Sequence, residues 1–295
     1  MSQTELLKPE FISKTATLQM VARSVVEGCI SGLHKSPFKG FSSEFAEFRE
    51  YIPGDELRYV DWKIYGKSDR LVIKEFQEET NLKAYILLDC SRSMEYGSGS
   101  LTKFRYAQYM AASLAYFLIR QQDSVGLVTF DREIKEFVKP GTTPMHLQNI
   151  LTVLEKSRPD GLTDITDICH TLAEGLKRRG LIIVISDLYD EQERVKKAIS
   201  HFLHKKHEVI LYHILDPLEL SLDFRGALEL VDSETGETCE IVPEVIKEEY
   251  RKKLETFMDG YREMARDSGL DYVTADTSRP FYEVLLAYLN FRQGT

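Results

Sequence analysis

The sequence has little of what several classes of protein depend on. Its 295 residues include four cysteines, spread along the chain without a C-x-x-C pair. That spacing argues against a disulfide framework or a cysteine-based zinc site and favours reduced thiols. No apolar run approaches the roughly 20 residues of a membrane-spanning helix. Residues 1–10 are polar and lack the pattern of a signal peptide. We therefore expect a cytoplasmic protein without a membrane span.

The chain also has fewer positive than negative charges. Its 38 lysines and arginines are outnumbered by 47 aspartates and glutamates, which gives a formal net charge of −9. A general nucleic-acid binder or a protein attracted to anionic membranes needs the opposite balance. No Walker A sequence occurs, and Gly97-Ser98-Gly99 lacks the third glycine of a dinucleotide-binding loop. The sequence thus predicts no nucleic-acid partner and no ATP hydrolysis by this chain alone.

Short apolar segments alternate with helical patterns from residue 83 onward. Strands are predicted at 84–88, 124–130, 134–138, 181–186, 208–215 and 271–275. Helices are predicted at 103–121, 145–155, 164–179, 191–204, 243–268 and 281–290, and another precedes them at 14–33. Such alternation is typical of an α/β fold, with a doubly wound, mostly parallel sheet and flanking helices.

Two segments interrupt this pattern. Residues 34–82 interleave charges and aromatics around the turn Pro53-Gly54 and end in a strand near 71–76. Residues 219–242 have the pattern of a β-hairpin insertion with a glycine-containing turn. The sequence therefore predicts an N-terminal region, 1–82, and a larger domain, 83–295, that carries the hairpin. We expect the hairpin to join the strands near 45–51 and 71–77 in a small β subdomain.

Oxygen-bearing side chains follow two of the predicted strands. Asp89, Ser91 and Ser93 stand at alternating positions after the strand 84–88, where open α/β sheets place their ligands. One carboxylate and two hydroxyls suit a hard cation such as Mg²⁺, which takes oxygen ligands and keeps several waters. Farther along, Thr163 lies in the loop before a helix, and Asp187 ends the strand 181–186. Helix capping is the alternative; it explains each residue singly but not the set.

Together, these five positions resemble the metal-ion-dependent adhesion site of von Willebrand factor A domains. The resemblance implies that Ser91 and Ser93 bind the ion directly and that Thr163 does so directly or through water. It implies that Asp89 and Asp187 act mainly through waters, with Mg²⁺ as the ion and Mn²⁺ or Ca²⁺ as alternatives. Neutral hydroxyls leave the ion's charge poorly cancelled, so its open position favours an Asp or Glu from a partner protein.

A second resemblance covers roughly residues 20 to 290. Phe-Lys-Gly at 38–40 precedes Glu-Phe-x-x-x-Arg-x-Tyr-x-Pro-Gly-Asp-x-x-Arg-x-x-Asp-Trp-Lys at 44–63. These residues are similar to the signature of the domain-of-unknown-function family fifty-eight, whose members carry a von Willebrand A domain. Leu162 stands where that family often has a glycine. Because the family is commonly encoded beside MoxR-type AAA+ ATPases, the resemblance implies an adaptor or co-chaperone of such an ATPase.

The charged and aromatic residues of the signature have two interpretations. One is a structural clasp on the following domain, because buried polar clusters usually serve packing. The other is a docking surface for another protein, formed by Arg49, Asp55, Arg58, Asp61, Trp62 and Lys63.

An enzyme is the competing class. A phosphatase of the haloacid dehalogenase type also places a strand-end Asp and a distant Asp on Mg²⁺. It needs a second acidic residue two positions after its nucleophilic Asp, and this chain has Ser91 there. A serine hydroxyl is not a general acid near pH 7. The sequence therefore predicts a Mg²⁺-dependent protein-binding module rather than an enzyme.

Overall fold

The computed structural model describes residues 17–33, 48–52, 60, 62–68, 70–74, 82–162, 164–176, 178–224, 226–232, 236–281, 283 and 285. The chain divides into two compact units. The larger comprises Met1–Gly32 and Leu82–Thr295, and the smaller comprises Leu33–Asn81. Helix α2 (Leu18–Leu33) therefore groups with the larger unit, and each unit is described by itself.

A six-stranded sheet forms the centre of the larger unit. Its strands are β3 (Lys83–Asp89), β4 (Ser124–Phe130), β5 (Ile134–Gly141), β6 (Leu181–Ser186), β7 (Glu208–Leu215) and β10 (Asp271–Asp276). They lie in the order β10-β7-β6-β3-β4-β5, and only the edge strand β5 runs antiparallel to its neighbour. The inner strands are buried on both faces, which explains their continuous apolar sequences. The predicted α/β, doubly wound, mostly parallel sheet is confirmed.

The strand order determines where a ligand site can form. The chain moves outward from β3 to β4 and β5, then returns to place β6 on the other side of β3 and continues to β7 and β10. The loops that follow β3 and β6 therefore diverge to opposite faces of the sheet. In open α/β sheets such a reversal leaves a crevice at the carboxyl ends of the two strands.

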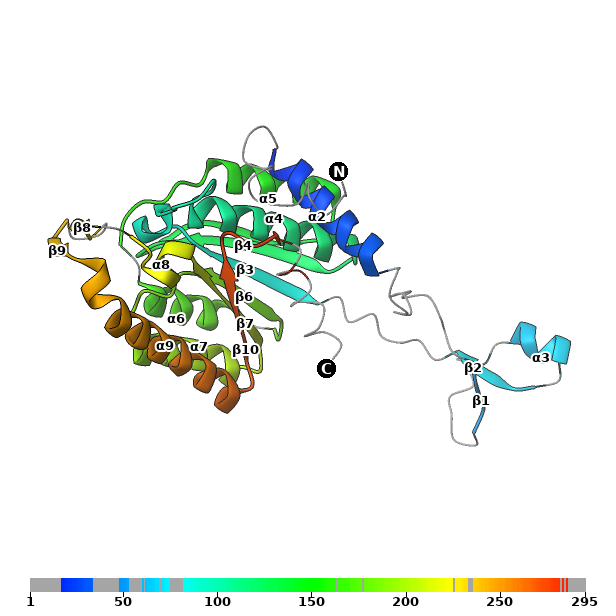
Figure 1. The fold of residues 1–295 in the computed structure, drawn as a ribbon. Coiled ribbons are helices and arrows are strands. Elements are labelled where there is room, and N and C mark those ends of the chain that lie inside the picture. The colour runs from blue at the N-terminus through cyan, green and yellow to red at the C-terminus, as the bar shows by residue number, and fades with distance from the viewer. Residues whose placement is uncertain are drawn as a thin grey trace. The chain divides into compact units, whose positions relative to one another are not determined.

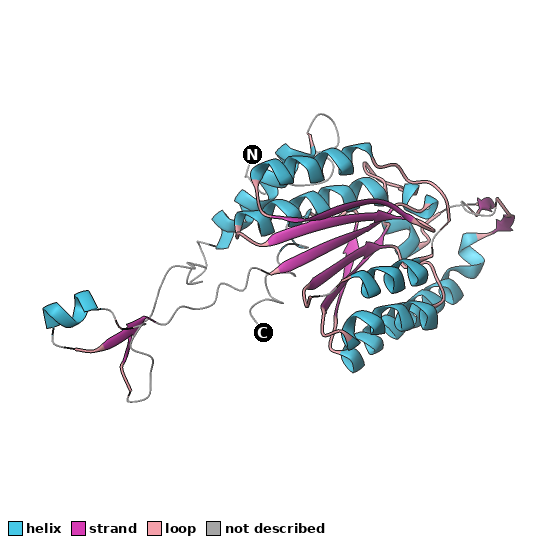
Figure 2. Ribbon diagram, turned by 180° about the vertical axis from the view of Figure 1, so that it is seen from behind, coloured by secondary structure: helices cyan, strands magenta, loops and turns pink. Residues whose placement is uncertain are grey.

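Helices cover both faces of the sheet (Figures 1 and 2). One face carries α4 (Lys103–Arg120), α5 (Pro144–Lys156) and α2, whose Leu18 N–H donates to Glu155 Oε1 at 3.3 Å. The other carries α6 (Ile165–Gly175), α7 (Gln192–His204) and the long α9 (Pro243–Ser268). Alternate strand residues such as Leu87 and Val184 pack against this second layer.

The short elements correct one prediction. Strands β8 (Leu228–Val231) and β9 (Thr238–Ile241) pair only with each other, and in the smaller unit β1 (Phe48–Glu50) pairs with β2 (Val72–Lys74). The expected joint β subdomain is therefore wrong for the described residues. The reason is local: Asp232 N–H donates to Glu237 O at 2.8 Å, which closes β8 onto β9. A short loop costs less entropy to close than pairing with a strand far away in the sequence.

Several helices and strands begin or end at other residues than the sequence predicted. Helix α6 ends at Gly175 rather than near residue 179, because Leu176 takes an extended conformation. Strand β5 continues to Gly141, past its predicted end. Two short elements, η3 (Arg92–Glu95) and α8 (Pro217–Ser221), follow β3 and β7, and α3 (Trp62–Ser68) belongs to the smaller unit. Most of the predicted helix at 281–290 lies outside the described residues. None of the described helices is both long and apolar enough to cross a membrane.

Candidate metal and partner-binding site

Two buried carboxylates lie at the reversal of strand order. Asp89 is the last residue of β3, and Asp187 directly follows β6, its parallel neighbour. The register pairs Leu88 with Ile185, so the two strands end side by side. Both aspartates are fully buried. The structure thus brings together two residues that are far apart in sequence, at the edge where this type of sheet places its ligands.

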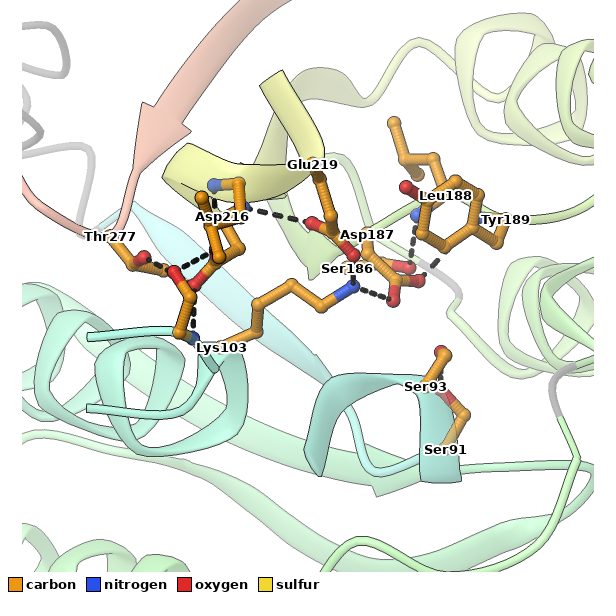
Figure 3. A network of polar contacts seen from close by, with 12 residues as sticks. Ser91, Ser93, Lys103, Ser186, Asp187, Leu188, Tyr189, Asp216, Glu219 and Thr277 are labelled. Atoms are coloured by element: carbon orange, nitrogen blue, oxygen red, sulfur yellow. Dashed lines mark hydrogen bonds and ion pairs between the residues drawn. The ribbon is translucent and has the colours of Figure 1, made fainter. Parts of the chain in front are cut away.

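The loop after β3 brings two hydroxyls together. Ser91 N–H donates to Asp89 Oδ1 at 2.8 Å, and the 3₁₀ helix η3 begins at the next residue. The turn leaves Ser91 Oγ and Ser93 Oγ 3.1 Å apart. Figure 3 shows both serines below Asp187, with the Ser93 hydroxyl turned toward it. Neighbouring oxygens around an octahedral Mg²⁺ are about 3 Å apart, given metal–oxygen distances of about 2.0–2.1 Å. The spacing of the hydroxyl pair therefore fits such an ion.

Sequence reasoning did not identify Ser186, which holds the second oxygen of Asp89. Ser186 Oγ donates to Asp89 Oδ2 at 2.6 Å and accepts from Leu188 N–H at 2.9 Å. Both oxygens of Asp89 therefore accept hydrogen bonds from the protein. Ser186 stands directly before Asp187, and this position at a strand end was the available signal.

The charge of Asp89 depends on its surroundings. Its pKa is raised to about 7, first by burial and then by the nearby charge of Asp187, while hydrogen bonds from Ser186 and Ser91 limit the rise. Two adjacent buried carboxylates without a cation are unfavourable. A positive charge beside the two carboxylates, from a side chain or from a divalent cation, relieves this repulsion.

Lys103, also missed from the sequence, lies beside Asp187. Its Nζ is 2.8 Å from Asp187 Oδ2 and 2.7 Å from Glu219 Oε1 of helix α8. Burial disfavours the ammonium, but these two carboxylates outweigh burial and raise the pKa of Lys103. The Tyr189 ring lies 4.8 Å from the same nitrogen. A signal existed: Lys103 is the first residue of α4, where the helix dipole disfavours a cation.

Asp216 connects the elements that surround this ion pair. It caps α8, and Glu219 completes the capping box by accepting from Asp216 N–H at 2.8 Å. Asp216 Oδ2 accepts from Ser98 N–H at 2.8 Å and from the Thr277 hydroxyl at 3.5 Å, and Oδ1 accepts from the Ser98 hydroxyl. The loop after η3, the start of α8 and the residues after β10 are therefore tied to one buried carboxylate (Figure 3).

Thr163 lies outside the described residues, but its loop is described on either side. Arg92 N–H donates to Gly161 O at 3.0 Å, and Asp160 N–H donates to Cys90 O at 2.8 Å. Gly161 has a φ of +78°, and a Cβ there would approach Asp131 Oδ2 to 2.7 Å. The positive φ and the closeness of Asp131, which follows β4, therefore favour glycine at this position. The role of Thr163 as a ligand stays a prediction.

Comparison with known protein families and curated proteins identifies sequences that are similar to this chain. Residues 47–262 match the family described as protein of unknown function DUF58. The chain belongs to this family. An uncharacterized protein of Mycobacterium tuberculosis strain H37Rv is 22% identical over 291 residues, which cover 97% of this chain and 90% of the relative. An uncharacterized protein of Mycobacterium avium is 25% identical over 133 residues, which cover 44% of this chain and 76% of the relative.

Solved structures resemble this DUF58 protein in fold. The conserved hypothetical protein BatB from Bacteroides thetaiotaomicron is similar with a TM-score of 0.50 and 16% identity, over 72% of this chain and 100% of BatB. The SpRpn10 VWA domain is similar with a TM-score of 0.42 and 12% identity, over 70% of this chain and 94% of that domain. The DUF58 chain therefore has the α/β fold with a mostly parallel sheet that its sequence predicted, and BatB has a similar fold.

The predicted docking residues belong to the smaller unit. Trp62 is 58% exposed in helix α3, and its ring meets Tyr65 edge-on at a centroid distance of 6.1 Å. Arg49 lies in β1 and Lys63 in α3, but their side chains are not described. The other three predicted positions, Asp55, Arg58 and Asp61, lie outside the described residues. A docking role for this DUF58 signature stays a prediction.

Conventional metal ligands are not clustered in the described part of the chain. No group of three or more His, Cys, Asp or Glu side chains there could hold a metal ion. The described residues do bring two neutral oxygens together after the end of β3, the hydroxyls of Ser91 and Ser93. Chemically, a site of this kind leaves a hard cation able to accept a further anionic oxygen.

Proposed function

We propose that this DUF58 protein is a Mg²⁺-dependent protein-binding module of the adhesion-site type. Ser91 and Ser93 would hold the ion, supported by Asp89, Thr163 and Asp187, with Mn²⁺ or Ca²⁺ as alternative ions. The bound ion supplies a Lewis-acidic position for an Asp or Glu carboxylate of a partner protein. The observation that carries this proposal is the 3.1 Å pair of serine hydroxyls beside two buried carboxylates.

The proposed partner is a MoxR-type AAA+ ATPase, for which the chain acts as an adaptor or co-chaperone in the assembly or maturation of protein complexes. This part of the proposal rests on the family signature at residues 38–63. The exposed Trp62–Tyr65 pair of the smaller unit offers a second contact surface. Aromatic side chains of this kind are enriched at protein interfaces. The expected cytoplasmic location belongs to the same proposal and rests on buried free thiols such as Cys90 and Cys169.

A pull-down from the cytoplasmic fraction of the native cells tests this function. The wild-type chain is the bait in Mg²⁺, in chelator, and in chelator followed by excess Mg²⁺. We expect the ATPase to be recovered in the first and third conditions and lost in the second. Ser91→Ala bait should recover it in none of the three, because one direct ligand is missing. A partner that binds equally well in chelator would contradict the adhesion-site mechanism.

A control bait separates the metal site from general effects of serine substitution. Ser200→Ala changes a surface residue of α7 whose hydroxyl bonds only to the nearby Lys197 O in the described residues. This bait should behave as the wild type does in all three conditions. Recovery of the ATPase by the Ser91→Ala bait at wild-type levels would count against a role for the hydroxyl pair.

We also propose that the chain is not a phosphohydrolase. Asp89 is fully buried, and both of its oxygens accept hydrogen bonds from Ser91 N–H and Ser186 Oγ, which is a poor environment for a nucleophile. The residue two positions later, Ser91, cannot protonate a leaving group near pH 7. Incubation with p-nitrophenyl phosphate and Mg²⁺ should therefore release no product above the uncatalysed rate. Turnover that Asp89→Ala abolishes would favour the enzyme instead.

A further inference from the structure

The adhesion-site function does not use the buried ammonium of Lys103, which lies beside Asp187. We propose that Lys103 is a built-in counter-cation that competes with the divalent ion for Asp187. In this role it weakens metal binding and keeps the metal-free protein folded, so that partner binding is reversible. This inference rests on the proposed metal site and names the residue that regulates it.

The first step is the cost of the metal-free site. Asp187 is fully buried, so its carboxylate cannot turn to bulk water for solvation. Asp89 ends the adjacent parallel strand, beside the start of the loop that carries Asp187, so the two negative charges repel. A buried carboxylate without a partner is strongly destabilising, whereas a paired one is tolerated. Lys103 Nζ, 2.8 Å from Asp187 Oδ2, provides that partner without any metal.

The second step is the effect of the ammonium on a metal. Lys103 Nζ donates a hydrogen bond to Asp187 Oδ2. The other oxygen of Asp187, Oδ1, accepts from Tyr189 N–H at 3.5 Å. A divalent cation that approaches Asp187 must therefore share this carboxylate with a fixed positive charge. The side chain of Lys103 is itself only 1% exposed, so solvent screens the repulsion weakly. Lys103 should accordingly lower the affinity of the site for every divalent cation.

The third step is the position of Glu219, which gives the ammonium a second partner. Glu219 Oε1 lies 2.7 Å from Lys103 Nζ, and Oε2 accepts from Asp216 N–H at 2.8 Å. Tyr250 OH donates to Glu219 O at 2.6 Å and fixes the backbone of α8. If a bound metal ion drew Asp187 away from Lys103, Lys103 would stay paired with Glu219 and would not become an unpaired buried charge. The carboxylate of Glu219 therefore favours the metal-bound state, and Lys103 opposes it.

The test is calorimetric titration with MgCl₂ alone, on the full chain and three variants. Lys103→Met keeps the length and apolar character of the side chain without the charge, and should bind Mg²⁺ at least about tenfold more tightly. Glu219→Gln removes a negative charge, so that Asp187 becomes the only charged partner of Lys103 among the described residues. This variant should bind Mg²⁺ at least about threefold more weakly than the wild type. Lys253→Met, which removes the same charge from an exposed pair with Glu249 on α9, should match the wild type.

Thermal unfolding in chelator and in Mg²⁺ gives a second readout. Lys103→Met should melt at a lower temperature than the wild type in chelator, because Asp187 has lost its cation. Mg²⁺ should raise its melting temperature more than that of the wild type, because tighter binding to the native state stabilises it more. A role of Lys103 in packing alone would lower both melting temperatures without this enlarged response to Mg²⁺.

The outcomes separate this inference from the function on which it rests. If the wild type binds Mg²⁺ and Lys103→Met binds with equal or lower affinity, the counter-cation role is overturned and the metal site stands. If only Lys103→Met binds Mg²⁺, the counter-cation role holds and the proposed function of the wild type fails. If neither binds, both fail. If Lys103→Met does not fold, Glu219→Gln decides, and binding as tight as in the wild type overturns the inference.

Discussion

Ser91→Ala is expected to weaken Mg²⁺ binding by about a hundredfold or more in calorimetric titration. Removing a residue that merely orients a ligand already costs about 10- to 100-fold in metal affinity, and Ser91 is proposed as a direct ligand. Its hydroxyl lies 3.1 Å from that of Ser93, so Ser93→Ala should have a similar effect. The fold should persist in both variants. The bond that shapes the loop runs from Ser91 N–H to Asp89 Oδ1, and alanine retains that N–H.

Two comparisons make this result interpretable. Ser200→Ala, on the surface of α7, removes a hydroxyl far along the chain from the loop after β3 and should leave the affinity unchanged. Circular dichroism of each variant checks that the helices remain. Wild-type affinity in both Ser91→Ala and Ser93→Ala would mean that the hydroxyl pair holds no cation, and the proposed function would then lose its main support.

Asp216→Ala is expected to lower the free energy of unfolding of the larger unit by about 3–5 kcal/mol. The substitution leaves the N–H groups of Ser98 and Leu218 without their acceptor, at about 1–3 kcal/mol each. The bond from Leu218 N–H is also the cap of α8, and the substitution removes the bonds from the Ser98 and Thr277 hydroxyls as well. At about 2–4 °C per kcal/mol, the melting temperature should fall by roughly 6–20 °C.

The measurement must report on the correct unit. The only tryptophan of the chain, Trp62, lies in the smaller unit, so its fluorescence would not follow the unfolding of the sheet. Far-ultraviolet circular dichroism follows α4, α7 and α9 instead. Asp223→Ala is the matched control, because Asp223 is an exposed partner of Lys247 just beyond α8 and should change the stability by less than about 1 kcal/mol. Equal losses in the two variants would show that Asp216 has no special structural role.

The features that the sequence predicted are those encoded by neighbouring residues. Apolar runs such as 208–215 and the helical spacing from 243 to 268 predicted β7 and α9 with the bounds that the structure has. The Asp-x-Ser-x-Ser turn was predictable because its bond from Ser91 N–H to Asp89 Oδ1 spans two residues. Asp187 was recognisable because it directly follows a buried strand. Periodicity and local hydrogen bonds are present in the amino-acid order itself.

Sequence reasoning failed where contacts join distant parts of the chain. Bonds that link Lys103 to Asp187 and to Glu219 span 84 and 116 residues. The bond from Ser186 to Asp89 spans 97 residues. No local pattern specifies such partners, because they depend on which strands become neighbours. The joint β subdomain was wrong for the same reason, since the hairpin pattern at 219–242 says nothing about strands beyond it.

The amino-acid sequence by itself determined the type of fold, the position of an oxygen-rich turn at the end of one strand, and the acidic residue at the end of another. Only the tertiary structure decided that β3 and β6 are adjacent, and that a buried lysine from α4 pairs with both Asp187 and a glutamate from α8. The physical reason is that the charge balance of a buried site is a sum over everything packed around it. That sum is defined only once the sheet order has brought the elements together.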